Sequence, residues 1–205
     1  MRYKHLPKNL PGFSLIELAL VLIIVGILVG ALFKGQDILE AAKIRATLSE
    51  IDRIRTAAAL YHDTFGQWPG NDPNAKNRFG QDVNNGQGNG VISGDETRQF
   101  WVHLAKAGHL SDGIAPSSKL GGKLTVEGDL TSRKNFLVLS GPENAGLLTP
   151  KQAAALKTKA GESDPSAGLL HITEGVGAPP NSCINGGVFN LATKIPTCIL
   201  KVELY

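Results

Sequence analysis

The sequence lacks the motifs by which common enzymes are recognised. It contains no Gly-x-Ser-x-Gly elbow, no glycine-rich phosphate loop followed by Lys-Ser or Lys-Thr, and no His-Glu-x-x-His pair. Its five histidines are scattered, and we expect His103 and His109 to be surface or capping groups on or after a helix. The sequence therefore gives no support for catalysis, and we predict a protein that is not an enzyme.

Proline and charge are missing from a long N-terminal stretch. No proline occurs between Phe13 and Gln67, and the apolar run of 21 residues from Phe13 to Phe33 contains a single charge, Glu17. As a helix this run would rise about 31 Å, enough to cross a hydrocarbon core of roughly 30 Å. A carboxylate in such a segment costs about 2.5–3.5 kcal/mol or more unless it has a partner, which makes Glu17 a candidate functional residue.

A partner for Glu17 exists if the chain is cut at the preceding glycine. Cleavage between Gly12 and Phe13 would create an α-amino group, with a pKa of about 8, one turn from Glu17 or within reach of the Glu17 of a neighbouring chain. Two rival kinds of N-terminal segment fit the sequence less well. A secretory signal would have a shorter apolar region followed by small residues, and an ordinary single-pass anchor gives no reason for Glu17 or for the Gly-Phe junction.

Residues 12–17, Gly-Phe-Ser-Leu-Ile-Glu, together with the apolar run resemble the class III leader junction of type IV pilins and type II secretion pseudopilins. The resemblance implies that a prepilin peptidase cuts after Gly12 and methylates the new N-terminus, Phe13. It also implies that Glu17 pairs with an N-terminal amine during filament assembly. The implied fold is α+β, with a long N-terminal helix packed on an antiparallel sheet. The implied partners are other copies of the chain, the peptidase, the membrane and an inner-membrane assembly platform.

Two positions depart from the family pattern. Pro11 stands where the family usually has Lys or Arg, which leaves peptidase recognition to Lys8 and Lys4. Because proline is absent from the helix, the break seen in many pilin filaments would have to come from a glycine: Gly26, Gly30 or Gly35.

The charges indicate how the chain is oriented in a membrane. The leader holds Arg2, Lys4 and Lys8 and no acidic residue, so its removal lowers the number of Lys and Arg from 21 to 18, against 18 Asp and Glu. Basic residues beside an anchor favour a cytoplasmic N-terminus. We therefore expect a bacterial inner-membrane protein with a single pass and a periplasmic C-terminus, assembled into an extracellular or periplasmic filament. Since the mature chain is formally neutral, nucleic acid is not an expected partner.

The expected segments are a leader (1–12), a transmembrane half-helix (13–33), an amphipathic half-helix (34–65) and a globular head (66–205). In the amphipathic half, apolar residues recur every three or four positions, which predicts one buried face: Ile44, Leu48, Ile51, Ile54, Ala58, Tyr61 and Phe65. The turn at residues 66–70 ends the helix. The rest, about 140 residues, is long enough for a single core.

A polar loop rich in glycine and asparagine covers residues 71–95. Counted from Asn85, its spacing matches an EF-hand-type calcium loop with Gly90 at the sixth place and Ile92 at the eighth. The candidate ligands are Asn85, Gln87, Asn89, Val91 through its carbonyl, and Glu96. Because most carboxylates of such a loop are missing, with Asp82 or Asp95 as further candidates, the expected calcium affinity is weak. No other cofactor is expected.

Glu96 also fits a structural role, which we favour. The run Ser93-Gly94-Asp95-Glu96 has the pattern of a capping box. It would open a helix that ends near Gly108 and carries Phe100, Trp101, Leu104 and Ala105.

The rest of the head predicts a small antiparallel sheet with one inserted helix. Strands are expected at 119–127 and 134–140 around a Gly128-Asp129 turn, at 168–173, and at 199–205. Thr149, Pro150 and Gln152 supply the N-cap, first-turn proline and capping-box residue of a helix near 150–160, which stops at Gly161.

The sequence has only two cysteines, Cys183 and Cys198, both in the C-terminal quarter. This use of cysteine fits an oxidising compartment. A bridge closing a loop of about 16 residues would stabilise the fold by about 3 kcal/mol in the chain-entropy model. Metal binding is the alternative, although no histidine lies at ligand spacing. By resemblance, the pair looks like the disulfide-bounded C-terminal loop of many pilins.

Three functions are open from the sequence. The first is a structural subunit of a type IV pilus-like filament. The second is a type II secretion pseudopilin, against which the two cysteines and long loops argue mildly. The third is a membrane-anchored adhesin or DNA-uptake minor pilin, for which the only modest basic cluster is Lys151, Lys157 and Lys159.

Overall fold

The computed structural model describes residues 12–205. The chain divides into two compact units, Met1–Ala42 and Lys43–Tyr205, which are treated in turn. The leader positions on which orientation and peptidase recognition were predicted, Arg2, Lys4, Lys8 and Pro11, lie outside the described residues.

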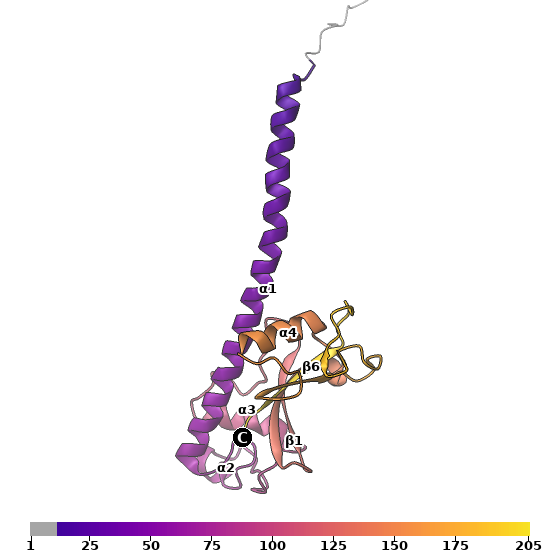
Figure 1. Ribbon diagram of the computed structural model, residues 1–205. Coiled ribbons are helices and arrows are strands. Elements are labelled where there is room, and N and C mark those ends of the chain that lie inside the picture. The colour runs from indigo at the N-terminus through magenta and orange to yellow at the C-terminus, as the bar shows by residue number, and fades with distance from the viewer. Residues whose placement is uncertain (1–11) are drawn as a thin grey trace, which may run out of the picture. The chain divides into compact units, whose positions relative to one another are not determined.

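One helix, α1 (Leu15–Phe65), makes up most of the described part of the first unit and continues into the second (Figure 1). It is 51 residues long and remains helical through Gly26, Gly30 and Gly35. In the first unit the Leu, Ile and Val side chains of α1 are exposed, from 45% for Val29 to 88% for Leu15. The predicted long helix is therefore confirmed, with its first turn beginning two residues after Phe13.

In the second unit, α1 buries one face in the head. Its buried apolar residues include five at the predicted spacing: Ile44, Ile51, Ile54, Ala58 and Tyr61. Leu48 and Phe65, on the same face, are only partly buried. The helix ends at the predicted turn, where Gly66 has a φ of +67° and its N–H donates to the His62 carbonyl at 2.7 Å.

Four antiparallel strands form one sheet in the order β1-β2-β6-β3. They are β1 (Lys123–Asp129), β2 (Lys134–Ser140), β3 (Leu170–Glu174) and β6 (Cys198–Glu203). β6 is last in the sequence but lies inside the sheet, between β2 and β3. Helix α3 (Glu96–Lys106) contacts β1, and α4 (Pro150–Lys159) contacts β6. The predicted α+β architecture, a long N-terminal helix with an antiparallel sheet, is thus confirmed.

Local signals located α4 accurately. The Thr149 hydroxyl accepts a hydrogen bond from Gln152 N at 3.3 Å, and Gln152 Oε1 accepts one from Thr149 N at 3.0 Å, which completes the predicted capping box. The helix ends at Lys159, just before Gly161, which has a φ of +80°.

The first hairpin differs from the prediction at its turn. β1 runs through Gly128 and Asp129 instead of turning there, and Gly128 pairs with Asn135. A Cβ on Gly128 would lie 2.4 Å from the carbonyl oxygen of Ile92. The glycine is therefore needed because the segment before α3 crosses the strand closely, and the turn follows at residues 130–133.

The sequence did not predict the shortest helices and strands. They are α2 (Ala75–Phe79), the 3-10 turn η1 (Pro142–Asn144), and a hairpin of β4 (Ile184–Asn185) and β5 (Val188–Phe189). Each has too few residues for a periodic pattern.

Candidate functional site

The N-terminal junction has an exposed aromatic residue and a carboxylate directed back along the chain. Phe13 is 78% exposed. Glu17 lies in the first turn of α1, and its Oε2 accepts a hydrogen bond from Ser14 N at 3.4 Å. The Ser14-x-x-Glu17 pattern is half of a capping box, a signal that was available in the sequence and was missed. Glu17 is therefore held on the side of the helix that faces Phe13.

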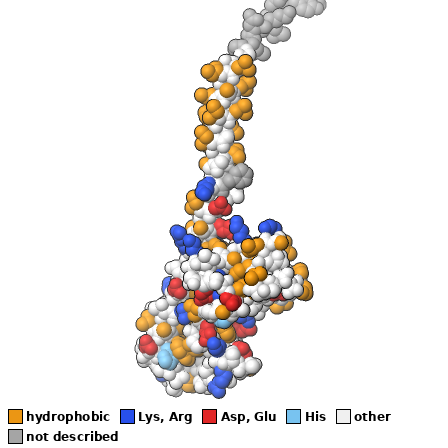
Figure 2. Space-filling model, in the orientation of Figure 1, with side chains coloured by type: hydrophobic (Ala, Val, Ile, Leu, Met, Phe, Trp, Pro, Cys, Tyr) orange, Lys and Arg blue, Asp and Glu red, His pale blue; other side chains and the backbone are white. Residues whose placement is uncertain are grey.

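The apolar part of α1 has the length and composition of a membrane span. The most apolar stretch of this helix has no buried residue. Figure 2 shows hydrophobic side chains along this part of the helix. It is the only such helix in residues 12–205. The predicted N-terminal apolar helix is therefore confirmed.

The two cysteines form a disulfide, as predicted. Cys183 and Cys198 are both fully buried, and their Cα atoms are 5.2 Å apart. The bond joins the segment before β4 to the first residue of β6. Four large apolar side chains are exposed near or within the segment that it closes: Val176, Val188, Leu191 and Ile195. The disulfide thus fixes a surface loop to the centre of the sheet.

The loop predicted to bind calcium is organised around Asn71, a residue that the sequence did not single out. The Asn71 side chain is almost completely buried. Its amide Nδ2 donates to Asn89 Oδ1 at 3.0 Å, to the Val91 carbonyl at 3.3 Å and to Glu96 Oε1 at 3.0 Å. Its Oδ1 accepts from Gly90 N at 2.7 Å, which fixes the orientation of the amide.

These acceptors include three of the five candidate calcium ligands. The structure brings Asn89, Val91 and Glu96 together, and a side-chain NH2 group lies among their oxygens. The other two ligands are used differently: Asn85 Oδ1 accepts from Lys76 N at 2.8 Å, and Gln87 donates its backbone N–H to Glu96 at 2.7 Å. Residues 12–205 contain no group of three or more His, Cys, Asp or Glu side chains placed to hold a metal.

Glu96 also has part of the capping role that was predicted. Its Oε2 accepts from Ser93 N at 2.9 Å, but the Ser93 hydroxyl does not cap the helix, and α3 begins at Glu96 itself. The capping box is therefore half formed. With Asn71, Gln87 and Ser93 all donating to it, the buried carboxylate connects the loop to the start of α3.

His103 is buried and its ring contacts two other segments, so the predicted role as a surface or capping group is wrong. Its Nδ1 accepts from Gly70 N at 2.9 Å, and its Nε2 lies 2.9 Å from the Asn84 carbonyl, so the neutral ring with a proton on Nε2 satisfies both contacts. Burial lowers the pKa of His103, although the Asn84 carbonyl and the charges of Asp72 and Glu96 oppose the shift. His103 thus connects the turn after α1 to the polar loop of residues 71–95.

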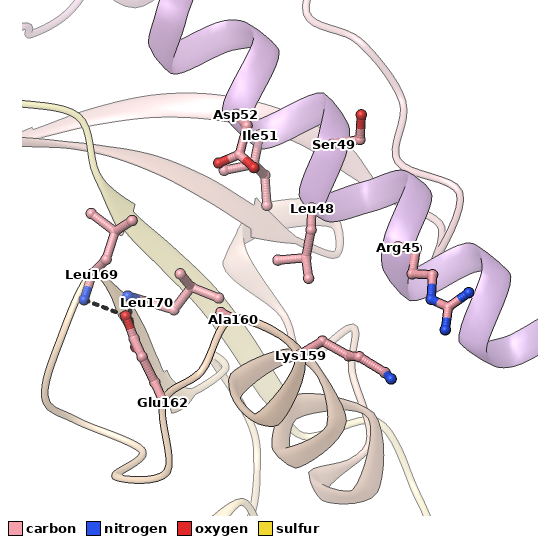
Figure 3. Close-up of a pocket in the computed structure, with 10 residues that line it drawn as sticks. All are labelled: Arg45, Leu48, Ser49, Ile51, Asp52, Lys159, Ala160, Glu162, Leu169 and Leu170. Carbon is pink, nitrogen blue, oxygen red and sulfur yellow. Dashed lines mark hydrogen bonds between the residues drawn. The ribbon is translucent and has the colours of Figure 1, made fainter.

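An open groove lies between α1 and α4 on the head, with a volume of about 540 Å³ (Figure 3). Leu48 of α1 and Leu169, just before β3, contribute apolar surface. In Figure 3, Arg45 and Lys159 extend toward one end of the groove, and Asp52 lies toward the other.

The three lysines considered for DNA binding do not form one exposed basic patch. Lys157 is fully buried, and its ammonium group donates to Glu162 Oε2 at 2.5 Å and to the carbonyls of Ala167 and Leu170, each at 2.6 Å. Burial raises the pKa of Glu162, but Lys157 and two backbone N–H groups outweigh it and hold that pKa below its usual value. Only Lys151 and Lys159 of the cluster are exposed.

Comparison with known proteins found a similar solved structure. No protein-family model matches the sequence, and the search of curated proteins found no match. Among solved structures, the chain is similar to the major type IV pilin PilA1 from Clostridium difficile, with 19% sequence identity and a TM-score of 0.45, over 80% of this chain and 96% of that chain. A likeness of this degree does not define a family.

Proposed function

We propose that this chain is a structural subunit of a type IV pilus-like filament. The observation that carries the proposal is the junction at residues 12–17, followed by an apolar helix with one carboxylate, Glu17. A leader ending at Gly12 would be removed by a prepilin peptidase, and Phe13 would become a methylated N-terminus. The chain would be held in a bacterial inner membrane by α1, with its head in the periplasm, until an assembly platform adds it to a filament.

The cost of an unpaired Glu17 carboxylate in lipid would favour assembly. An unpaired carboxylate in lipid is unfavourable, and the attraction to a positive amine is stronger in a medium of low dielectric constant. Glu17 already accepts a bond from Ser14 N, which places its carboxylate toward the N-terminal side of the helix. A subunit therefore gains when its Glu17 meets the amine of Phe13 on a neighbour, and this favours docking at the base of a growing filament.

The alternatives are less well supported by the head. A pseudopilin or a minor pilin would carry the same junction, so the N-terminus does not separate them. The disulfide and the exposed loop that it fixes favour a subunit with a durable outer surface. DNA uptake loses its support because Lys157 is buried in an ion pair. Nucleic acid is accordingly not a proposed partner.

Glu17→Ala tests the proposal in a cell that has the processing and assembly machinery. The variant should be inserted and cleaved normally, because a neutral helix is more stable in lipid, but it should enter filaments poorly. Asp63→Ala, which removes an exposed carboxylate from the other end of α1, is the matched control. If Glu17→Ala subunits expressed alone polymerised as well as the wild type, the proposed role of Glu17 in assembly would be wrong. If the wild type itself did not polymerise, a membrane-anchored binding protein would become the better description of the chain.

A further inference from the structure

We propose that Asn185 is a site of spontaneous deamidation, through which the exposed loop fixed by the disulfide gains a carboxylate. The reaction takes up water and releases ammonia, so it needs neither an enzyme nor a cofactor. The inference concerns the outer surface of the head and does not depend on the proposed role in a filament.

Deamidation of an asparagine requires the next backbone nitrogen to reach its side chain. The Gly186 nitrogen loses its proton to a base in solution and bonds to Asn185 Cγ, and the bond from Cγ to Nδ2 breaks as the side-chain nitrogen leaves with solvent protons as ammonia. Water then opens the cyclic imide at either of its carbonyl carbons, which gives aspartate or isoaspartate without oxidation or reduction. A glycine in the second position favours ring closure because it has no Cβ to obstruct the approach.

The dipeptide Asn-Gly occurs three times in the sequence, at residues 85–86, 89–90 and 185–186. All three asparagines are exposed, so access to water does not distinguish them. What distinguishes them is whether the two reacting groups, the glycine nitrogen and the asparagine side chain, are already held by hydrogen bonds.

The first of these sites is held by the segments around it. Gly86 N donates to the Asp72 carbonyl at 2.8 Å, and Asn85 Oδ1 accepts from Lys76 N at 2.8 Å. Gly86 is also closely packed, because a Cβ on it would lie 2.3 Å from the Gly70 carbonyl oxygen. Both reacting groups are therefore directed toward other partners.

The second site is held by the buried amide of Asn71. Gly90 N donates to Asn71 Oδ1 at 2.7 Å. Asn89 Oδ1 accepts from Asn71 Nδ2 at 3.0 Å and from Val91 N at 2.9 Å. Three hydrogen bonds must therefore break before the Gly90 nitrogen can attack the Asn89 side chain.

The third site has neither reacting group held in this way. Asn185 is the last residue of β4 and pairs with Val188 of β5, and Gly186 begins the turn between the two strands. Neither the Asn185 side chain nor the Gly186 N–H forms a hydrogen bond with any residue from 12 to 205. Beyond its chain neighbours, a Cβ on Gly186 would meet no atom within 4 Å. The ring can therefore close without the loss of a tertiary contact.

The hydrogen bonds set the expected difference in rate. The folded chain must open locally at the first two sites before ring closure, and each broken hydrogen bond lowers the population of the open form. Two bonds should slow the reaction of Asn85 about 30-fold relative to Asn185, and three should slow that of Asn89 about 100-fold.

The modification would change the surface of the head with time. In a chain without the predicted leader, it raises the number of Asp and Glu from 18 to 19, against 18 Lys and Arg. Isoaspartate also adds a CH2 group to the main chain, which disturbs the pairing of Asn185 with Val188. A long-lived copy would therefore present a more acidic and less regular loop than a newly made one.

Mass spectrometry of the full chain tests the proposal. The purified chain is incubated in detergent with its disulfide intact, in heavy-oxygen water, at neutral pH and at about pH 9, and is then digested in acid. The oxygen of the new carboxyl comes from this water, so it marks conversions that occurred before digestion. Asn185 should convert first, and it should convert faster at the higher pH because the attacking nitrogen must lose its proton.

The unfolded chain provides the reference rates. In urea with the disulfide reduced, all three Asn-Gly sites should convert at rates within about threefold of each other, because no native hydrogen bond protects them. Two results with the folded chain would overturn the proposal. One is conversion of Asn185 no faster than that of Asn85 and Asn89. The other is an intact Asn185 after the time in which the unfolded chain converts it fully.

Isoelectric focusing of two variants gives an independent measurement. Asn185→Gln keeps an amide, but its longer side chain closes a larger ring and reacts more slowly. Asn77→Gln, an exposed change in α2 at a position not followed by glycine, is the matched control. After incubation, the wild type and Asn77→Gln should each gain a more acidic band, and Asn185→Gln should not. An equally strong acidic band from Asn185→Gln would place the reaction elsewhere and refute the assignment.

Discussion

Replacing Asn71 by Asp would test whether a side-chain amide takes the place of a cation in the head. The change keeps the shape of the side chain but turns the NH2 group, which donates to Asn89, Val91 and Glu96, into an oxygen. A carboxylate would then face Glu96 Oε1 across about the 3.0 Å that now separates donor from acceptor. Two carboxylates this close cannot both be ionised without a cation between them.

The size of the effect follows from the proton that the pair must hold. Keeping one carboxyl neutral at pH 7, when its unfolded pKa is about 3.9, costs roughly 4 kcal/mol, and the loss of a second donor adds about 1–2 kcal/mol. The free energy of unfolding should therefore fall by about 5–6 kcal/mol at pH 7. It should fall by only about 2.5–3.5 kcal/mol at pH 5, where the proton is easier to hold. The new site would also present oxygens alone to calcium, which takes such ligands at about 2.3–2.6 Å.

Both effects can be measured by urea denaturation of the compact unit Lys43–Tyr205. The measurement is made without calcium and with about 10 mM calcium. A dissociation constant of about 0.1 mM would return about 2.7 kcal/mol to the Asn71→Asp variant. The wild type should bind calcium no more tightly than about 10⁻⁴–10⁻³ M. Asn77→Asp, in the exposed part of α2, is the control. A loss below about 1 kcal/mol with no response to calcium would refute the reasoning.

Three further changes test other parts of the chain. Gly12→Val should leave an uncleaved membrane precursor, since the peptidase must approach the backbone closely; mass spectrometry should find its N-terminus at Met1, and finding it at Phe13, as expected for the wild type, would contradict this. Cys198→Ser should lower the free energy of unfolding of the head by about 2–5 kcal/mol without altering cleavage, and an unchanged urea midpoint would argue against it. His103→Gln should reduce acid sensitivity: because burial lowers the folded pKa of His103, its contribution to stability is complete above pH about 6.5 and is lost as the pH falls below that value. Equal losses for wild type and variant between about pH 7.5 and 5.5 would show that another group is responsible.

Features set by neighbouring residues were predictable from the sequence. The spacing of Ile51, Ile54 and Tyr61 indicated the buried face of α1, and the capping box of Thr149 and Gln152 located α4 to within a residue. In both cases the signal and the structure depend on residues within a few positions of each other.

Features set by distant segments could not be predicted in this way. Gly128 was interpreted as a turn residue because its sequence neighbours do not show that the segment at Ile92 will cross the strand. His103 was assigned to the surface because its partners, Gly70 and Asn84, come from two other segments. Asn71 lies 25 positions before Glu96. The spacing of the candidate ligands from Asn85 to Glu96 therefore could not predict that the amide of Asn71 would lie among their oxygens.

The position of β6 between β2 and β3 has a consequence for biosynthesis. The hairpin of β1 and β2 leaves the ribosome well before β6, and at about 5–20 residues per second the roughly 63 residues from Ser140 to Glu203 take about 3–13 s to synthesise. During that time β2 has an unpaired edge, and near the end of it Cys183 waits for its partner thiol, which is made 15 residues later. The apolar part of α1 is therefore complete long before the head can fold. A chaperone that met the chain in this interval would find an open sheet edge and, once Cys183 has been made, a free thiol.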